Sequence, residues 1–166
     1  MEEILKLQKQ LICILKNHIV NILNLEVTFD YIGILPTYYI DINNFSRMQD
    51  GYGFNSVTGE SYVSEKEGAW RDGWFVFAHN WMEDPFYIDL NQENIGFPVY
   101  YSLHGQGKWI PIKIADTIAQ FEMILRKLKV KDTDAPFELA SLHLEIDSSN
   151  EFWIEVDETC KELGCV

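Results

Sequence analysis

Four side chains of the sequence could carry out chemistry together. Imidazoles at His79, His104 and His143 could bind a metal ion or transfer protons. Asp84 could add a carboxylate to His79 and His104 in an enzyme or a small-ligand site. Their spacing matches no metal-binding or catalytic motif, and neither G-x-S-x-G nor H-E-x-x-H occurs. Such a site therefore depends on a fold that gathers these groups in one pocket.

Two carboxylates, Asp84 and Asp89, flank the run Pro85-Phe86-Tyr87-Ile88 and could act as general acid and base or hold a cation. A strand advances about 3.3 Å per residue and turns successive side chains to opposite faces. The two carboxylates would then lie on opposite faces and roughly 17 Å apart, too far to share one substrate. We predict instead that Asp84 forms a turn and that Asp89 bonds backbone amides at a strand end.

The segment His104-Gly105-Gln106-Gly107-Lys108 has the glycines and the lysine of a phosphate-binding loop. A phosphate-binding loop joins a strand to the N-terminus of a helix, whereas this segment joins two predicted strands. We therefore predict a hairpin turn in which glycine supplies the positive φ angles.

The cysteines offer neither a disulfide framework nor a complete metal site. There are three cysteines, Cys13, Cys160 and Cys165, and an odd number gives no disulfide framework. Free cysteines of this kind are consistent with a reducing cytoplasm. Cys160 and Cys165 could supply half of a metal site, but no second pair completes four ligands. Cys13 lies on the apolar stripe of a predicted helix and is expected in the core. We predict no metal and no cofactor.

The chain is strongly acidic, and its charge is unevenly distributed. Twenty-six acids against thirteen bases give a formal net charge of −13, which argues against direct binding of nucleic acid. Residues 132–162 hold ten acids and one base, Lys161, whereas residues 1–25 hold two acids and three bases. The acidic segment is either a solvated surface that keeps the protein soluble or a face that steers a basic partner.

The N-terminal sequence lacks the features of a signal peptide. Glu2 and Glu3 stand where a signal peptide carries basic residues, and polar residues interrupt the apolar positions that follow. No run of the chain approaches the roughly 20 apolar residues that cross a bilayer. We therefore expect a cytoplasmic protein that does not bind membranes.

The elements that must position these groups begin with a predicted amphipathic helix over residues 3–24, where apolar side chains recur at helical spacing. Alternating residues over 26–31 predict a strand. Residues 38–48 fit either a strand or a helix, and Tyr62 and Val63 fit a short strand or its edge.

Four apolar runs separated by turns then predict an antiparallel meander. They cover residues 73–78, 85–90, 97–103 and 109–114. No linker or repeat divides the chain, so we predict one α+β domain over residues 1–166. In this domain, the N-terminal helix and a later helix pack on a mostly antiparallel central sheet.

Two elements are expected after the meander. Asp116 should cap the later helix, because apolar side chains follow it at helical spacing and cations gather near the expected C-terminal end. Alternating apolar residues at Phe152, Ile154 and Val156 fit either a last strand or the opening turn of a short helix.

Aromatic residues are unusually dense between Trp70 and Trp109. Because alternate side chains of a strand face opposite ways, one core cannot readily hold both members of Phe86-Tyr87 or of Tyr100-Tyr101. Either the chain's own helices cover the second face of the sheet, or that face is an exposed binding surface rich in Tyr and Trp.

Short motifs in this region form an ordered series. They are Trp70-x3-Trp74 with Phe75-Val76-Phe77-Ala78, Asp84-Pro85-Phe86-Tyr87-Ile88-Asp89, Pro98-Val99-Tyr100, His104-Gly105, Trp109-Ile110-Pro111 and Ile114-Ala115-Asp116-x4-Phe121. The series resembles the SUKH superfamily, which includes fungal cell-wall assembly regulators and many bacterial immunity proteins. Asp50-Gly51 stands where members often have Asn-Gly, and the acidic segment over residues 132–166 has no counterpart in that pattern.

The resemblance implies an α+β fold with a central sheet and no catalytic apparatus. It implies that a bacterial member would bind and neutralise a toxin, commonly a nuclease. An acidic protein suits such a partner, because these nucleases are typically basic and carboxylates can mimic phosphate charge. We therefore expect a non-enzymatic immunity protein. A regulatory or scaffold module is the first alternative, and a small-ligand binder or enzyme is the second.

The expected partner-binding residues are aromatic and acidic side chains left exposed around the sheet. They are Trp70, Trp81, Glu83, Asp84, Tyr87, Tyr101, Asp134 and Glu138. Aromatic side chains would supply contact area, and the acids would attract a basic toxin domain. Whether they adjoin one another depends on the fold.

Overall fold

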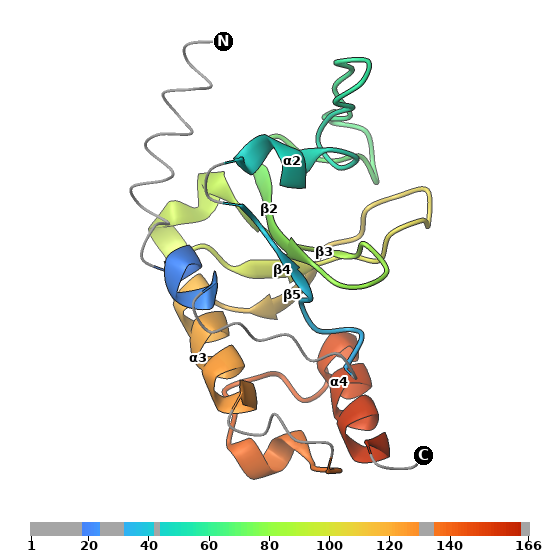
Figure 1. The fold of residues 1–166 in the computed structure, drawn as a ribbon. Helices are drawn as coiled ribbons and strands as arrows, with labels where there is room; N and C mark the ends of the chain where they lie inside the picture. The colour runs from blue at the N-terminus through green and yellow to red at the C-terminus, as the bar shows by residue number, and fades with distance from the viewer. Residues whose placement is uncertain (1–17, 24–31, 42–43, 130–134, 164–166) are drawn as a thin grey trace.

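The part of the chain that the structure describes forms a five-stranded sheet in which all neighbouring strands are antiparallel (Figure 1). The structure is a computed structural model, and it describes residues 18–23, 32–41, 44–129 and 135–163. The strands lie in chain order: β1 (Tyr38–Tyr39), β2 (Trp74–His79), β3 (Pro85–Asp89), β4 (Val99–Tyr101) and β5 (Ile112–Ala115). The predicted α+β class and antiparallel meander are confirmed.

Polar residues and glycines end the strands where the sequence predicts. Asp89 Oδ1 accepts a hydrogen bond of 2.9 Å from the backbone N–H of Asn91 at the end of β3, and the 3-10 helix η1 (Leu90–Ile95) follows. Gly105 and Gly107 have φ angles of 80° and 70°, so the glycine-rich segment is a turn between the antiparallel strands β4 and β5.

The uncertain segment over residues 38–48 contains both of its predicted alternatives. It begins with the short strand β1, and the helix α2 (Phe45–Gln49) starts near its end. Of the predicted helix over residues 3–24, the structure describes residues 18–23, which are helical. The predicted strand over residues 26–31 lies outside the described residues.

Helices α3 (Ile118–Lys129) and α4 (Glu151–Glu162) cover one face of the sheet (Figure 1). The residue that caps α3 is Thr117, and not the predicted Asp116. Thr117 Oγ1 accepts a hydrogen bond of 3.0 Å from the backbone N–H of Gln120, which leaves Asp116 to form a 2.6 Å ion pair with Lys113.

The alternating residues Phe152, Ile154 and Val156 belong to the helix α4. Asn150 caps this helix, because its side-chain oxygen accepts a hydrogen bond from the backbone N–H of Phe152. Phe152, Trp153 and Val156 are buried at helical spacing, whereas Ile154 is 43% exposed. The strand alternative is thus wrong, since a strand would have placed all three alternating residues on one face.

The aromatic residues of the meander divide between the two faces of the sheet. Phe77 and Phe86 lie on the face that α3 covers, with ring centroids 6.0 and 6.1 Å from that of Phe121. They belong to the main hydrophobic core, which the residues of α4 complete. The alternation of Phe86 and Tyr87 sends the second ring to the opposite face.

The opposite face of the sheet is covered chiefly by the loop between α2 and β2, together with Met48 of α2 (Figure 1). Tyr52, Trp70, Val76 and Tyr87 form a second buried cluster there. The ring centroids of Trp70 and Tyr87 lie 5.0 Å apart. Val63, predicted in a short strand or its edge, forms only an isolated bridge to Trp70. The chain's own residues therefore cover most of the second aromatic face.

Candidate partner-binding surface

The turn between β2 and β3 presents large side chains to solvent. Trp81 and Met82 are 55% and 70% exposed, whereas Asn80 and Asp84 at the two ends of the turn are 1% and 3% exposed. Glu83 is exposed beside them. Trp and Met are enriched in protein interfaces, so this turn is a candidate contact surface.

A buried hydrogen-bond network fixes the turn from below. The Asn80 side-chain oxygen accepts hydrogen bonds of 2.9 and 3.0 Å from the backbone N–H groups of Met82 and Asp84. The Asn80 side-chain nitrogen donates a hydrogen bond of 2.9 Å to Asp84 Oδ2. Asn commonly bonds the backbone two residues ahead in turns, and here those bonds hold the backbone on both sides of the exposed residues.

The Asp84 carboxylate extends this network to the end of β4. The Tyr101 hydroxyl donates a hydrogen bond of 2.8 Å to Oδ2, and the backbone N–H of His104 donates one of 2.6 Å to Oδ1. Burial, and then the charge of Asp84, raise the pKa of Tyr101 well above its ordinary value, so its hydroxyl keeps the proton that it donates. Asp84 is therefore the turn former that the sequence predicts, with both carboxylate oxygens engaged.

Glu83 completes the turn in a left-handed backbone conformation, with a φ angle of 63°. Such a conformation is unfavourable for a residue with a side chain and persists where neighbouring contacts hold it. The Tyr52 hydroxyl provides such a contact, because it donates a hydrogen bond of 2.7 Å to the Glu83 carbonyl oxygen. Burial is the main cause that raises the pKa of Tyr52, so this donor also stays protonated.

The edge strand β1 extends the exposed patch. Tyr38 is 43% exposed, and its ring centroid lies 5.3 Å from that of Trp81 in an edge-on arrangement. The ring of Tyr38 also lies 5.0 Å from that of His79. We refer to Tyr38, His79, Trp81, Met82 and Glu83 as the Trp81 surface.

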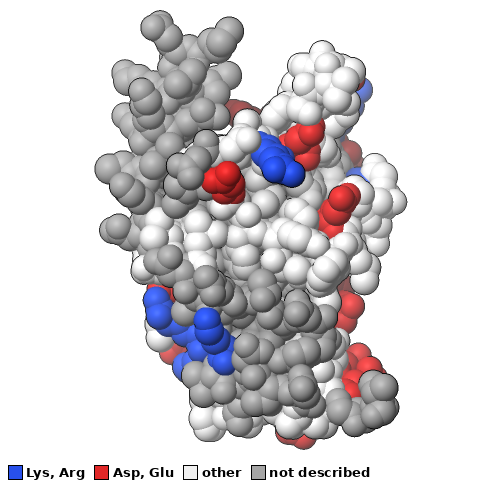
Figure 2. Space-filling model, viewed as in Figure 1, with Lys and Arg blue, Asp and Glu red and all other residues white. Residues whose placement is uncertain are grey.

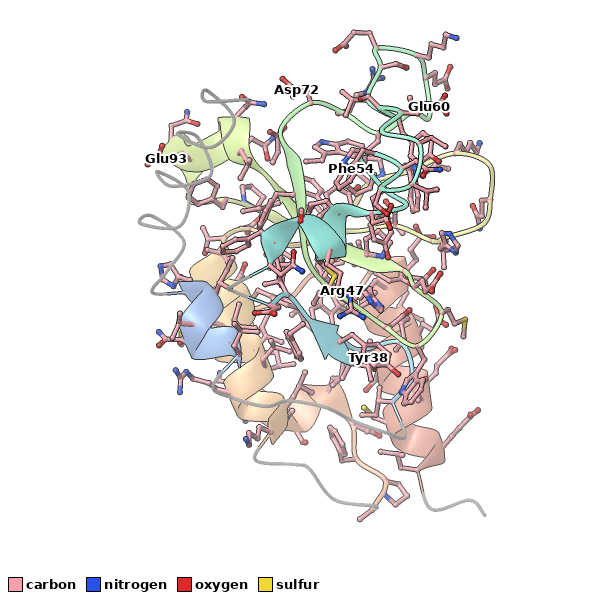
Figure 3. The ribbon with its side chains drawn as sticks, turned by 45° about the horizontal axis from the view of Figure 1, so that its top comes forward. Tyr38, Arg47, Phe54, Glu60, Asp72 and Glu93 are labelled. Atoms are coloured by element: carbon pink, nitrogen blue, oxygen red, sulfur yellow. The ribbon has the colours of Figure 1, made fainter. Side chains whose placement is uncertain are left out.

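A pocket of about 430 Å³ opens beside the Trp81 surface, with walls from β1, α2 and the turn between β2 and β3. Its charged residues include Asp41, Arg47 and Asp50. Figure 3 labels Arg47 of α2 and Tyr38 of β1, both of which line the pocket. Hydrogen bonds from the Ser56 hydroxyl and backbone N–H hold the pKa of Asp50 below its ordinary value. The pocket can therefore offer both rings and carboxylates to a polar group of a partner.

The pocket gathers only part of the group that an enzyme or small-ligand site would need. His79 and His104 line it, but Asp84 does not, because its carboxylate is engaged below the turn. His143 lines a different groove, beside α4. Among the residues that the structure describes, no three His, Cys, Asp or Glu side chains are grouped so that they could hold a metal ion.

The predicted partner-binding residues divide between the surface and the interior. The exposed ones are Trp81, Glu83 and Glu138. Four lie in the interior and not on the surface, because the chain covers both faces of the sheet: Trp70, Asp84, Tyr87 and Tyr101. Asp134 lies outside the described residues. The structure brings Trp81 and Glu83 together in one turn, whereas Glu138 precedes the 3-10 helix η2 (Leu139–Leu142) in another part of the molecule.

The predicted partner-binding residues omit three members of the Trp81 surface: Tyr38, His79 and Met82. His79 is predicted only as a candidate for a metal or catalytic site. Met82 could have been found, since it stands between Asn80 and Asp84 in a turn too short to bury it. Tyr38 carries no comparable signal, because its segment fits a strand and a helix equally well.

A model of the SMI1 / KNR4 family (SUKH-1) matches residues 2–123 of the chain. The matched range includes the whole described sheet and the Trp81 surface, and it ends within α3. No curated protein and no solved structure matches the chain significantly. No helix within the described residues is long and apolar enough to cross a membrane.

Proposed function

The chain belongs to the SMI1 / KNR4 family (SUKH-1), and from this premise we propose that it is a non-enzymatic immunity protein that binds and neutralises a toxin in the cytoplasm. One observation carries the proposal: the turn between β2 and β3 exposes Trp81, Met82 and Glu83 above a buried hydrogen-bond network. The toxin is expected to be a nuclease, whose basic surface complements an acidic protein.

A fixed turn favours tight binding. A surface that is already ordered loses little conformational entropy when a partner docks on it. Asn80 and Asp84 order this turn without exposing their own side chains. Trp81 then supplies a large rigid ring, the kind of side chain that dominates binding energy in interfaces.

Charge supports a basic partner. The formal net charge of the chain is −13, so a basic toxin domain would be attracted before contact. Glu83 places a carboxylate next to Trp81, and Asp41 and Asp50 line the adjoining pocket. Carboxylates at these positions would face the Lys and Arg side chains with which a nuclease contacts phosphate.

The engagement of Asp84 supports binding over catalysis. A general base needs an oxygen free to accept a proton from substrate. Both oxygens of Asp84 already accept hydrogen bonds within the protein. His79 and His104 line the pocket, whereas Asp84 does not.

Co-expression with the toxin encoded beside this gene tests the proposal. The wild-type protein should restore growth, and Trp81→Ala should reduce or abolish the rescue. Ile110→Ala is the matched control, because Ile110 is a similarly exposed apolar residue, 48% exposed, outside the Trp81 surface. Absence of rescue and of binding by the wild-type protein would reject the proposed function for that toxin.

A regulatory or scaffold module is the second candidate. The chain belongs to the SMI1 / KNR4 family, and the SUKH superfamily that it resembles includes fungal cell-wall assembly regulators. Such a module would use the same Trp81 surface on a host protein. Under this alternative, no toxin would be neutralised, and a host protein would co-purify with the wild-type chain but not with Trp81→Ala.

A further inference from the structure

A second concave surface lies between η2, the residues that follow it, and α4. It is a groove of about 320 Å³, whose apolar walls include Leu139, Leu144, Trp153 and Ile154. Leu139 and Trp153 are buried at its base, whereas Ile154 is 43% exposed at its side. We refer to it as the α4 groove. The helix α4, which forms one of its walls, lies on the opposite side of the sheet from the loop between α2 and β2 (Figure 1).

Polar contacts hold the walls of the α4 groove in place. Asp157 Oδ1 of α4 accepts a hydrogen bond of 2.7 Å from the backbone N–H of Leu139, which fixes η2 to the helix. Trp153 Nε1 donates a hydrogen bond of 2.8 Å to the Ile114 carbonyl oxygen, which fixes α4 to the edge strand β5. The groove is therefore preformed and needs little ordering to accept a ligand.

The segment that forms the α4 groove is strongly acidic. Residues 135–163 hold eight acids and one base, Lys161. Lys161 is paired with Asp157 at 2.7 Å, which leaves the exposed carboxylate of Glu158 on the groove for a partner. Figure 2 shows acidic residues on the side of the molecule where α4 lies and basic residues over α3. A groove with apolar walls and an acidic rim complements a segment with the opposite charges.

The α4 groove also lies outside the part of the chain that the family shares. The family match ends at residue 123, and the groove is built from residues 139–161. A surface outside the matched region is suited to distinguish one partner from another, because members that share the matched region can differ there.

We propose that the α4 groove selects the partner by binding a basic amphipathic segment of it, in which an apolar side chain is flanked by Lys or Arg. The apolar side chain would enter between Leu144 and Ile154, and a flanking cation would face Glu158. The identity of the partner as a toxin rests on the proposed function. A second copy of this chain fits poorly, since it would bring a like-charged face against the rim.

A peptide-binding experiment tests the groove by itself. The probe is a labelled peptide of Lys and Leu at helical spacing, and its control has Ser in place of each Leu. By fluorescence anisotropy the wild-type protein should bind the Lys/Leu peptide more tightly than the Lys/Ser peptide. Ile154→Glu and Glu158→Lys should each lower the affinity for the Lys/Leu peptide by about tenfold or more. Equal binding of the two peptides would overturn the inference.

Matched variants separate the groove from general electrostatics. Ile95→Glu places the same charge at another exposed apolar residue, 54% exposed, and Glu60→Lys reverses an exposed acid in the loop between α2 and β2 (Figure 3). Both should bind the Lys/Leu peptide like the wild type. Losses equal to those of the groove variants would show that net charge alone attracts the peptide, and would overturn the inference.

The growth-rescue assay then distinguishes this inference from the proposed function. If Ile154→Glu and Glu158→Lys rescue fully while Trp81→Ala does not, the groove plays no part in partner selection and the proposed function stands. If the wild-type protein rescues no toxin but binds the Lys/Leu peptide through the groove as expected, the proposed function fails and the groove stands as a binding site for a basic segment.

Discussion

The side-chain nitrogen of Asn80 donates a 2.9 Å hydrogen bond to the Asp84 carboxylate, and this buried pair brackets the three exposed residues of the turn. The pair ties the turn between β2 and β3 to the end of β4, because Asp84 also accepts hydrogen bonds from Tyr101 and from the backbone of His104. A binding surface supported in this way keeps its shape without a partner.

Loss of the Asp84 carboxylate should destabilise the whole domain. In Asp84→Ala three donors lose their acceptor, two of them buried, so the free energy of unfolding should fall by about 2–4 kcal/mol. Urea denaturation measures the change. Asp116→Ala is the control, because that carboxylate is exposed and forms an exposed ion pair with Lys113, so its effect should be much smaller. Equal effects of the two substitutions would show that the network under the turn contributes nothing.

Trp70 and Trp81 should respond in opposite ways to truncation. Trp81→Ala removes an exposed ring, so the free energy of unfolding should change by less than about 1 kcal/mol while partner binding weakens. Trp70→Ala empties a buried site against Tyr87 and should cost about 3–5 kcal/mol. Denaturation curves of both variants, with the rescue assay for Trp81→Ala, check this. A large loss of stability in Trp81→Ala would contradict its role as a surface residue.

Glu122 should make stability depend on pH in the acid range. Burial alone would raise its pKa, but hydrogen bonds from Arg126, His18 and Asn21 outweigh burial and hold the pKa below its ordinary value of 4.5. The stabilisation is then complete above pH 4.5 and is lost as the pH falls through the lower pKa of the folded state. The difference in stability between wild type and Glu122→Gln should shrink below that pH in urea titrations. A difference that stays constant with pH would contradict this role.

The Cys160 thiol should be inert in the folded protein. Burial raises its pKa to about 12, and its side chain is fully buried on the inner face of α4. Iodoacetamide at pH near 8 should therefore leave Cys160 unmodified in the native state and alkylate it after denaturation. Peptide mapping by mass spectrometry distinguishes the two states. Rapid native alkylation of this residue would show that α4 opens from the sheet.

The sequence by itself determined the local elements of this fold. Alternating apolar runs and polar turn residues are local signals, so β2, β3 and the glycine turn before β5 could be predicted without knowledge of their neighbours. The ordered motifs likewise led to the family. Local signals failed where two patterns overlapped, as at Phe152, Ile154 and Val156, because a short apolar alternation fits a strand and a helix turn alike.

Only the tertiary structure decided which of these residues a partner can reach. Trp70 and Trp81 are the same residue type in the same aromatic stretch, yet one is 2% exposed and the other 55%. The difference arises because the loop between α2 and β2 packs its residues Tyr52 and Trp70 against Tyr87 of the sheet and leaves the turn uncovered. Asp84 is engaged because His104, twenty residues later, comes beside it in the turn that follows β4. Exposure and engagement depend on contacts between distant segments, which no local pattern encodes.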